Sequence, residues 1–275
     1  AFGVLRIEGQ GADARLVEWQ SPESRADIDT RRKATMMIAG DKYSYFWRDK
    51  GGFDYLRFIY DSDYNPSATG QLQGPCGCNN VKHIYGNSAD HVAEMGMADG
   101  RMASALATHI LRLSDVYLVH AEAMTLMGRG SEASALAAYN AVHQRAIPTA
   151  APATSLTFDM IWKERRLEFA GEGDRWYDFV RRAYYDVNAC INELKSQHRN
   201  QLWNCDALYK AYYQSGAWGL TTADGTVEYN FDTPVPNVTE KSFVLPFPTE
   251  DVALNPNVAS DAPSVHVNIR EAYSY

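Results

Sequence analysis

Five carboxylates and six basic side chains fall within the twenty residues of KERRLEFAGEGDRWYDFVRR, from Lys163 to Arg182. Two of the carboxylates, Glu164 and Glu168, could serve as a general acid and base. Residues four apart on a helix lie within ~6 Å of each other at Cβ, whereas hydrolases usually draw their two carboxylates from separate elements. The arginines between them lower a carboxyl pKa, and a general acid needs the opposite shift. The pattern therefore favours a structural network over catalysis.

We interpret this cluster as ion pairs that tie one helix to the turn and the helix after it. A helix is predicted to start after Thr157 and to end at Gly171, with Arg165 on its apolar face. Because Glu168 lies three residues beyond Arg165, the spacing predicts an intrahelical pair between them. The predicted structural salt-bridge network comprises Arg165, Glu168, Glu172 and Arg175.

The composition excludes several function classes. The formal net charge of −8 argues against nucleic-acid binding, which requires clustered Lys and Arg, and against adhesion to an anionic membrane surface. The 275 residues can bury a sizeable core, and 45% of them are hydrophobic, which is ordinary for a folded domain. No stretch approaches the roughly 20 apolar residues that a transmembrane helix needs.

The segment GPCGCNN places two cysteines ahead of His83 and His91, in the order C-x-C-x4-H-x7-H. C-x-C is not the usual spacing of a zinc site, so we expect no metal and no cofactor. A disulfide is more plausible if the protein is exported. The sequence leaves every pairing open among Cys76, Cys78, Cys190 and Cys205, and free buried thiols remain an alternative.

The sequence divides into three segments. Residues 1–101 are broken by turn residues, with alternation in YSYFW and YLRFIY that fits short strands or an aromatic loop. Residues 102–215 are helical, and residues 216–275 form a loop and short-strand tail. In the helical segment, ILRLSDVYLVHAEAMTLMG and SEASALAAYNAVHQRA predict two antiparallel helices that resemble a tetratricopeptide unit. The apolar face of the first is predicted to contain Leu113, Val116, Tyr117, Met124 and Met127.

Aromatic and polar side chains are mixed most densely between Tyr43 and Tyr64. Sugars stack their C–H faces on aromatic rings and hydrogen bond to polar groups, so this stretch is the candidate ligand site. An alternative is that alternate residues here form a strand core. The predicted ligand-binding residues are Tyr45, Trp47, Tyr64 and Trp218, the last in the loop AWGLT.

Four blocks follow one another in order: RLSDVYLVHAEAM, YNAVHQRA, IWKERRLEFAGEGDRWYDFVRR and FVLPFPTEDVALNPN. Together they resemble the carboxy-terminal half of the SusD/RagB family, with matches that include Arg112, Asp115 and Glu122. The family's E-R-R-x-E-x-x-x-E-G-x-R-x-x-D block is similar to residues 164–178. The resemblance covers roughly residues 25 to 257. It implies a mainly α fold with tetratricopeptide-like hairpins, of which residues 1–275 are the carboxy-terminal portion of one SusD-like domain.

The resemblance also implies a function. Members are outer-membrane lipoproteins at the cell surface of Bacteroidetes that bind glycans or other nutrients without cleaving them. They pass the ligand to a TonB-dependent SusC-like transporter. We therefore expect a glycan ligand, such a transporter as partner, and an upstream half of the same protein that carries the lipid-anchor cysteine.

Two other functions remain open from the sequence. One is a glycan-cleaving enzyme that uses loop carboxylates such as Asp49, Asp61 or Asp63. The other is a docking module for the transporter, with no ligand of its own.

Overall fold

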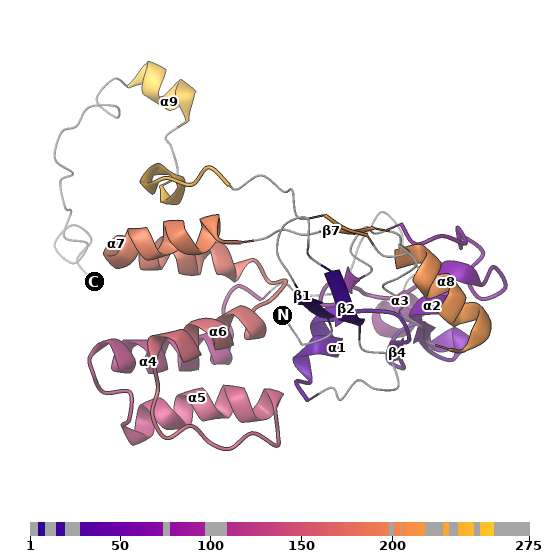
Figure 1. Cartoon of the computed structure of the whole chain (residues 1–275), viewed down its shortest axis with the longest axis horizontal. Coiled ribbons are helices and arrows are strands. Elements are labelled where there is room, and N and C mark those ends of the chain that lie inside the picture. The colour runs from indigo at the N-terminus through magenta and orange to yellow at the C-terminus, as the bar shows by residue number, and fades with distance from the viewer. Residues whose placement is uncertain are drawn as a thin grey trace. The chain divides into compact units, whose positions relative to one another are not determined.

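The computed structural model describes residues 28–73, 78–96, 109–197, 205–217, 236–244 and 248–255. It also gives the backbone of two hairpins, in which β1 (Leu5–Glu8) pairs with β2 (Arg15–Trp19) and β7 (Gln201–Trp203) pairs with β8 (Glu228–Asn230). Its contacts divide the chain into two compact units. Unit 1 comprises residues 1–178 and 196–235, and unit 2 comprises residues 179–195 and 236–275. Helices dominate the described residues, so the expected mainly α fold is confirmed (Figure 1).

Three helices form the bundle of unit 1: α4 (Leu113–Leu126), α5 (Ala133–Ala146) and α6 (Phe158–Glu168). They lie side by side, with α4 and α5 joined by a short turn as in the predicted hairpin (Figure 1). Gly130 in that turn cannot carry a side chain, because its Cβ would come within 2.8 Å of the Leu156 carbonyl oxygen. The glycine therefore lets the segment before α6 run directly against the hairpin turn.

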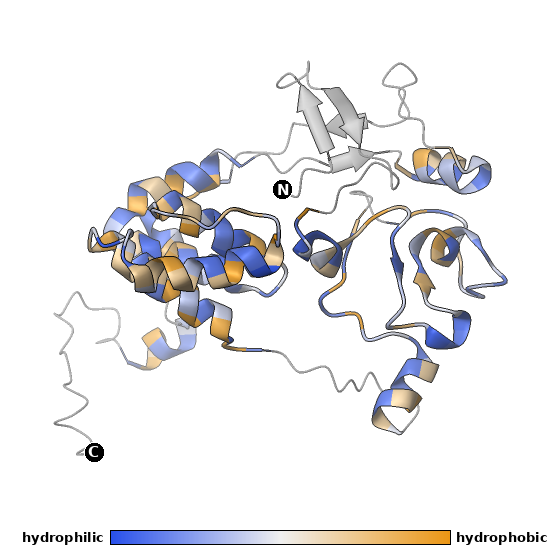
Figure 2. Ribbon diagram, turned by 90° about the horizontal axis from the view of Figure 1, so that it is seen from below, coloured by the Kyte–Doolittle hydropathy of each residue, from blue (hydrophilic) through white to orange (hydrophobic). Residues whose placement is uncertain are grey.

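The core of the bundle lies on a different face of α4 from the one predicted. Leu118 and Ala121 are fully buried against α5 and α6, and Met124 is buried as expected. The other predicted core residues of this helix, Leu113, Val116, Tyr117 and Met127, are exposed. The prediction was wrong because α4 is apolar on both faces, and periodicity cannot tell which of two apolar faces meets α5 and α6. Hydrophobic and hydrophilic residues alternate along the helices of the bundle (Figure 2).

The chain continues from the bundle into α7 (Asp174–Lys195). It lies in the segment predicted to be helical and consists of two helices that meet in a kink at Asp186, whose φ of −148° and ψ of 65° are not helical. Helix α8 (Cys205–Ser215) lies at the end of the segment 102–215 that was predicted to be helical. In unit 2, η4 (Glu240–Phe243) and α9 (Thr249–Leu254) occupy part of the predicted tail, where we expected a short strand.

The segment before the bundle contains short helices as well as short strands. The strands form two antiparallel pairs: β3 (Met36–Met37) with β6 (Asn79–Asn80), and β4 (Lys42–Tyr43) with β5 (Phe53–Asp54). The helices are α1 (Arg31–Thr35), the 3-10 turn η2 (Arg48–Lys50), α2 (Tyr55–Tyr60) and α3 (Ser88–Met95).

The stretch YLRFIY, for which we expected a short strand or an aromatic loop, is helix α2. Its N-cap Asp54 accepts hydrogen bonds from the backbone N–H groups of Leu56 and Arg57. The side chains of Tyr55, Leu56 and Ile59 are buried on one helical face. The cap and this spacing together outweigh the β propensity of the aromatic residues.

Helix α8 packs against α2 and closes this aromatic part of unit 1. Tyr209 of α8 is fully buried and its ring lies edge-on to that of Tyr55, with 6.4 Å between centroids. The Tyr60 hydroxyl donates to the Asp206 carboxylate at 2.8 Å. Residues far apart in sequence thus build one core.

None of the described helices is both long and apolar enough to cross a membrane.

We expect Leu118→Ala to lower the free energy of unfolding by about 3 kcal/mol, because it leaves a cavity at a fully buried site. Urea denaturation measures this change. Leu254→Ala is the matched control, since Leu254 is 87% exposed and its truncation should change stability by less than about 0.5 kcal/mol. Equal losses in the two variants would contradict the core described here.

Candidate ligand-binding site

The loop between β4 and β5 presents two aromatic side chains on either side of a buried one. Tyr45 is 58% exposed, Phe46 is buried, and Trp47 is partly buried. Trp47 has a φ of 55° and a ψ of 40°, a left-handed conformation that non-glycine residues rarely adopt. Such a conformation costs about 1–3 kcal/mol and persists only where surrounding contacts impose it.

Asp90 of α3 supplies the contacts that hold this loop. Its buried carboxylate accepts the backbone N–H of Trp47 at 2.5 Å and that of Arg48 at 3.3 Å. The same carboxylate accepts the Asn87 N–H at 3.0 Å, within the capping box of α3. Burial alone would raise the pKa of Asp90, but these hydrogen bonds outweigh it and hold the pKa below its ordinary value. Asp90 therefore fixes the start of α3 and the conformation of Trp47 together.

The Trp47 ring belongs to an aromatic cluster beside an open hollow of 440 Å³. Its centroid lies 5.0 Å from that of Tyr64, 5.4 Å from that of Phe58 and 5.6 Å from that of Phe53. The polar side chains around the same hollow are those of Asn79, Asn80 and Asn87. Flat rings and amide groups thus line one surface.

A second hollow, of 490 Å³, adjoins the first and shares Phe46 and Ile84 with it. Tyr45, Arg48 and Lys82 contribute to its walls. The two residues next to Phe46 in sequence therefore line different hollows. Tyr45 lines the second hollow and Trp47 lines the first.

The predicted ligand-binding residues have different positions in the structure. Tyr45 and Trp47 border the two hollows. Tyr64 is only 3% exposed, whereas a ring that stacks on a ligand has to be accessible. Its hydroxyl donates to the Gly52 carbonyl at 2.6 Å and accepts the Asp54 N–H at 3.0 Å, which locks the turn before β5. Trp218 lies outside the described residues.

The sequence reasoning missed the residues that line the hollow from the segment 79–90. In GPCGCNN only the cysteines were considered as functional residues, whereas its two asparagines, Asn79 and Asn80, line the hollow. Within the described residues, no group of His, Cys, Asp and Glu side chains is arranged to hold a metal ion. His83 instead hydrogen bonds through Nε2 to the Gly171 carbonyl at 2.9 Å. Cys78, Cys190 and Cys205 form no disulfide with one another, so the suggested pairing of Cys190 with Cys205 is not present, and Cys76 is outside the described residues.

The charged cluster that suggested acid–base chemistry is an ion-pair network in the structure. The Glu168 carboxylate is almost fully buried and pairs with Arg112 at 2.5 Å, with Arg31 at 3.3 Å and with Arg145. Burial by itself raises the pKa of Glu168, but the paired arginines, Arg112 first, outweigh it and hold the pKa at about 2. Glu172 pairs with both Arg112 and Lys82, and its pKa is also lowered.

The predicted intrahelical pair between Arg165 and Glu168 is not formed. Arg165 pairs with Asp115 of α4 at 2.6 Å and with Asp178 of α7 at 2.8 Å. Arg175 lies over the Trp162 ring at 3.7 Å and within 3.9 Å of the Asp178 carboxylate. All four residues of the predicted network thus lie in ion pairs, although their partners come from other helices as well as the adjacent turn.

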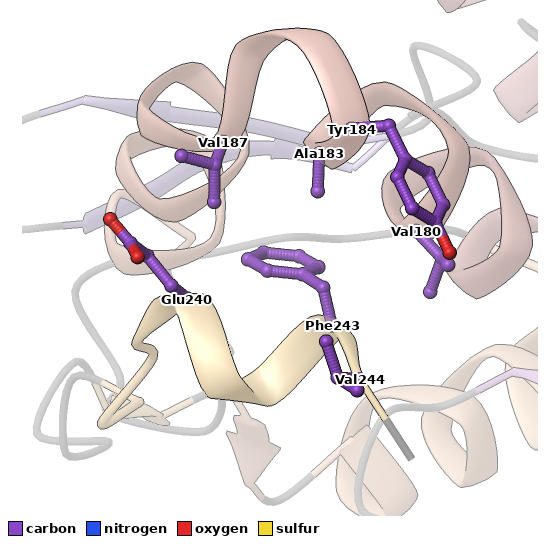
Figure 3. Close-up of a pocket in the computed structure, with 7 residues that line it drawn as sticks. All are labelled: Val180, Ala183, Tyr184, Val187, Glu240, Phe243 and Val244. Atoms are coloured by element: carbon purple, nitrogen blue, oxygen red, sulfur yellow. The ribbon is translucent and has the colours of Figure 1, made fainter. Parts of the chain in front are cut away.

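A third hollow, in unit 2, has a different character. It measures 240 Å³ and lies between α7 and η4, where the Phe243 ring points toward Ala183 and Val187 (Figure 3). Among the described residues that line it, Glu240 is the one with a carboxylate. The wall is largely apolar and lacks the convergent polar groups that orient a sugar, so the candidate site is the pair of hollows in unit 1.

Comparison with known proteins decides the family. The sequence model of the SusD family matches residues 20–263. The chain belongs to the SusD family. A SusD-like protein of Bacteroides ovatus is 33% identical over 236 residues, which are 82% of this chain and 38% of that protein.

Solved structures agree with the fold. A crystal structure with a xylogluco-oligosaccharide superposes with a TM-score of 0.62 and 28% identity, covering 89% of this chain and 45% of that one. A SusD-like protein of Bacteroides fragilis gives a TM-score of 0.50 at 20% identity, covering 82% of this chain and 37% of that one. This SusD-family chain thus spans less than half the length of the relatives named here.

We expect Glu168→Gln to lower the free energy of unfolding by about 3 kcal/mol at pH 7, because three arginines lose their buried counter-charge. A carboxyl with a lowered pKa stabilises the fold above its unfolded value near 4.5, and this contribution is lost as the pH falls toward 2. The stability gap between wild type and variant should therefore be widest above pH 5 and close toward pH 2. Urea titrations at several pH values measure the gap.

Glu132→Gln is the control, because Glu132 pairs with Arg129 at the surface. Solvent screens an exposed pair so strongly that it adds little stability, and this variant should therefore stay close to wild type. A gap for Glu168→Gln that does not change with pH would refute the assigned pKa.

Proposed function

We propose that this chain binds a carbohydrate, without cleaving it, in the hollows beside Trp47 and Tyr45. The observation that carries the proposal is the left-handed conformation of Trp47, which a buried carboxylate holds in place. Strain of this kind clusters at ligand sites, where the surroundings fix one side chain in a set position. A ring fixed in this way offers a stacking surface that loses little conformational entropy on binding.

The chemistry around Trp47 suits a sugar. Pyranose rings stack on indole and phenol faces, and their hydroxyls hydrogen bond to amides. Asn79 donates to the Tyr55 hydroxyl at 3.0 Å, and Asn80 accepts the Lys82 N–H at 2.9 Å. Among the described residues, Asn79 Oδ1 and Asn80 Nδ2 have no hydrogen-bond partner. An acceptor and a donor therefore remain for a ligand.

The charges near the hollows favour a neutral sugar over an acidic one. Arg48 pairs with Glu94 at 2.7 Å and with Asp90 at 3.3 Å. Lys82 pairs with Glu172 at 2.5 Å. A uronic acid would have to compete with these internal carboxylates for the same cations.

The carboxylates also favour binding over hydrolysis. Asp61 accepts a hydrogen bond from the Arg57 side chain, and this bond first, with further bonds from the backbone of Tyr64, lowers its pKa. Asp49 accepts from the Asn87 side chain at 2.7 Å. A general acid needs a raised pKa so that it carries a proton at neutral pH. The lowered pKa of Asp61 therefore argues against that role.

For the whole protein we propose the role that membership in the family suggests. It would be a lipid-anchored protein of the outer membrane that presents a glycan at the cell surface to a TonB-dependent, SusC-like transporter. The family match and the oligosaccharide in the related crystal structure support this proposal.

We expect Trp47→Ala to weaken binding of a neutral oligosaccharide at least about tenfold, because it removes a stacking surface held by the fold. The probe is a xylogluco-oligosaccharide, measured by isothermal titration calorimetry on the full-length protein, with product sizes checked in the same samples. Trp176→Ala is the control, since that indole is 42% exposed on α7 and outside both hollows. Unchanged binding in Trp47→Ala, an equal loss in Trp176→Ala, or cleavage of the probe would each contradict the proposal.

Asp90→Asn should weaken the same binding severalfold while the thermal midpoint falls by only a few degrees, because a neutral amide holds the Trp47 backbone less firmly. Tryptophan fluorescence reports any change around the indole. Asp61→Asn is matched to it, as Asp61 also caps backbone N–H groups but belongs to neither hollow. If Asp90→Asn binds as tightly as wild type, Asp90 does not position Trp47 for the ligand.

A further inference from the structure

The segment that contributes both asparagines to the first hollow lies against the turn that follows α6. Lys82 donates through Nζ to the Glu168 carbonyl at 2.9 Å and to the Glu172 carboxylate at 2.5 Å. Next to it, the His83 ring hydrogen bonds through Nε2 to the Gly171 carbonyl at 2.9 Å. Two consecutive side chains of this segment are thus fixed to one turn.

Gly171 of this turn is in contact with the side-chain amide of Asn80. A Cβ on Gly171 would lie 2.7 Å from Nδ2 of Asn80 and 3.3 Å from both its Cγ and its Oδ1. The first of these distances is far inside van der Waals contact, and all three atoms belong to the carboxamide. The amide of Asn80 therefore occupies the space that a side chain at position 171 would need.

The Asn80 amide is held in place and still keeps a donor for a ligand. The backbone of Asn80 pairs with Met36 in the ladder of β3 and β6. Its Oδ1 accepts the Lys82 N–H at 2.9 Å, which sets the orientation of the carboxamide. Asn80 is exposed and lines the first hollow. Its Nδ2, which has no acceptor among the described residues, can therefore donate to a sugar hydroxyl.

The backbone of the turn does not by itself explain why position 171 lacks a side chain. Gly171 has a φ of 81° and Gly173 has a φ of 93°, so both adopt the left-handed conformation that favours glycine. Asn and Asp also adopt this conformation in many turns. A Cβ on Gly173 would meet nothing within 4 Å, whereas one on Gly171 would meet the amide of Asn80. The two glycines thus share a conformation and differ in one contact.

We propose that Gly171 is a positioning residue of the carbohydrate site, which holds the Asn80 carboxamide so that Nδ2 donates to a hydroxyl of the bound sugar. A side chain at position 171 would displace this amide with little disturbance of the fold, because the displaced group is the end of an exposed side chain. The inference rests on the proposed function and deepens it. Asn80 hydrogen bonds to the sugar that stacks on Trp47, and the turn after α6 sets the direction of that bond.

The test measures the affinity of the full-length protein for a xylogluco-oligosaccharide by isothermal titration calorimetry. Gly171→Ala should weaken binding about threefold to tenfold, because the hydrogen bond from Asn80 is lost. Gly173→Ala is the matched control. Both variants place alanine at a positive φ and should lower Tm by a similar few degrees, but Gly173→Ala should bind as tightly as wild type. Equal affinities in the two variants would overturn the proposal.

A double variant separates positioning from a general structural role of Gly171. Asn80→Ala should weaken binding to about the same extent as Gly171→Ala. When the two changes are combined, the second should cause no further loss, because no carboxamide remains to be displaced. If Gly171 affected binding only through the stability of the turn, the two losses would multiply, and that result would contradict the proposal.

The double variant also keeps the test decisive if Gly171→Ala alone does not fold. Without the carboxamide of Asn80 there is space for the new methyl group, so the double variant should fold and bind like Asn80→Ala. If the double variant also fails to fold while Gly173→Ala folds, Gly171 serves the fold alone and the proposal is wrong.

Trp47→Ala distinguishes a failure of this inference from a failure of the proposed function. If Trp47→Ala weakens binding while Gly171→Ala and Gly173→Ala bind equally well, only the role of Gly171 is refuted. If wild type does not bind the oligosaccharide, or if Trp47→Ala binds it as tightly as wild type, the carbohydrate site is refuted, and the role of Gly171 with it.

Discussion

The burial of one carboxylate, Glu168, sets the arrangement of unit 1. Its three arginine partners come from α1, from the residue before α4 and from α5, while Glu168 itself ends α6. Removing a charge from water costs several kcal/mol unless it is paired and hydrogen bonded, so these elements must meet at the correct register. A shift by one residue in any of them would leave a buried charge without its partner. The ion pairs therefore specify the arrangement more than they add to stability.

The same constraint reaches the candidate binding site. Arg31 leads directly into Arg32, which pairs with Asp41 at 2.5 Å just before β4 and thereby fixes the start of the aromatic loop. On the other side of the site, Lys82 donates to the Glu168 carbonyl at 2.9 Å and to the Glu172 carboxylate at 2.5 Å. The segments that carry Trp47 and the asparagines are thus anchored to the end of α6. A loop that presents a ligand surface needs a rigid frame, and the charged cluster supplies it.

Much of this arrangement could be predicted from the sequence, and the failures have physical causes. The hairpin of α4 and α5 follows from its periodicity and its glycines, and the ordered blocks identify the family. The residues of the ion network were also identifiable, since Arg165 on an apolar helix face must find a carboxylate. Its partners were not, because Asp115 and Asp178 lie on other helices, and the sequence does not state which helices are neighbours. Only the three-dimensional packing excludes the local pair with Glu168.

The candidate site was only partly predictable for a related reason. An aromatic-rich stretch shows that rings are present, but the pleat and turn of the backbone decide which of them face water. Trp47 and Tyr64 are both aromatic residues next to polar ones, and yet Tyr64 is buried, with its hydroxyl bonded to Gly52 and Asp54. The left-handed conformation of Trp47 has no local sequence signal, since it depends on Asp90 more than forty residues away. On α4 the hydropathy pattern fails for another reason. Both faces of the helix are apolar, so the pattern cannot tell which of them packs against α5 and α6. Where a helix is apolar on two faces, its sequence predicts packing contacts for both, and only the structure shows which face the bundle buries.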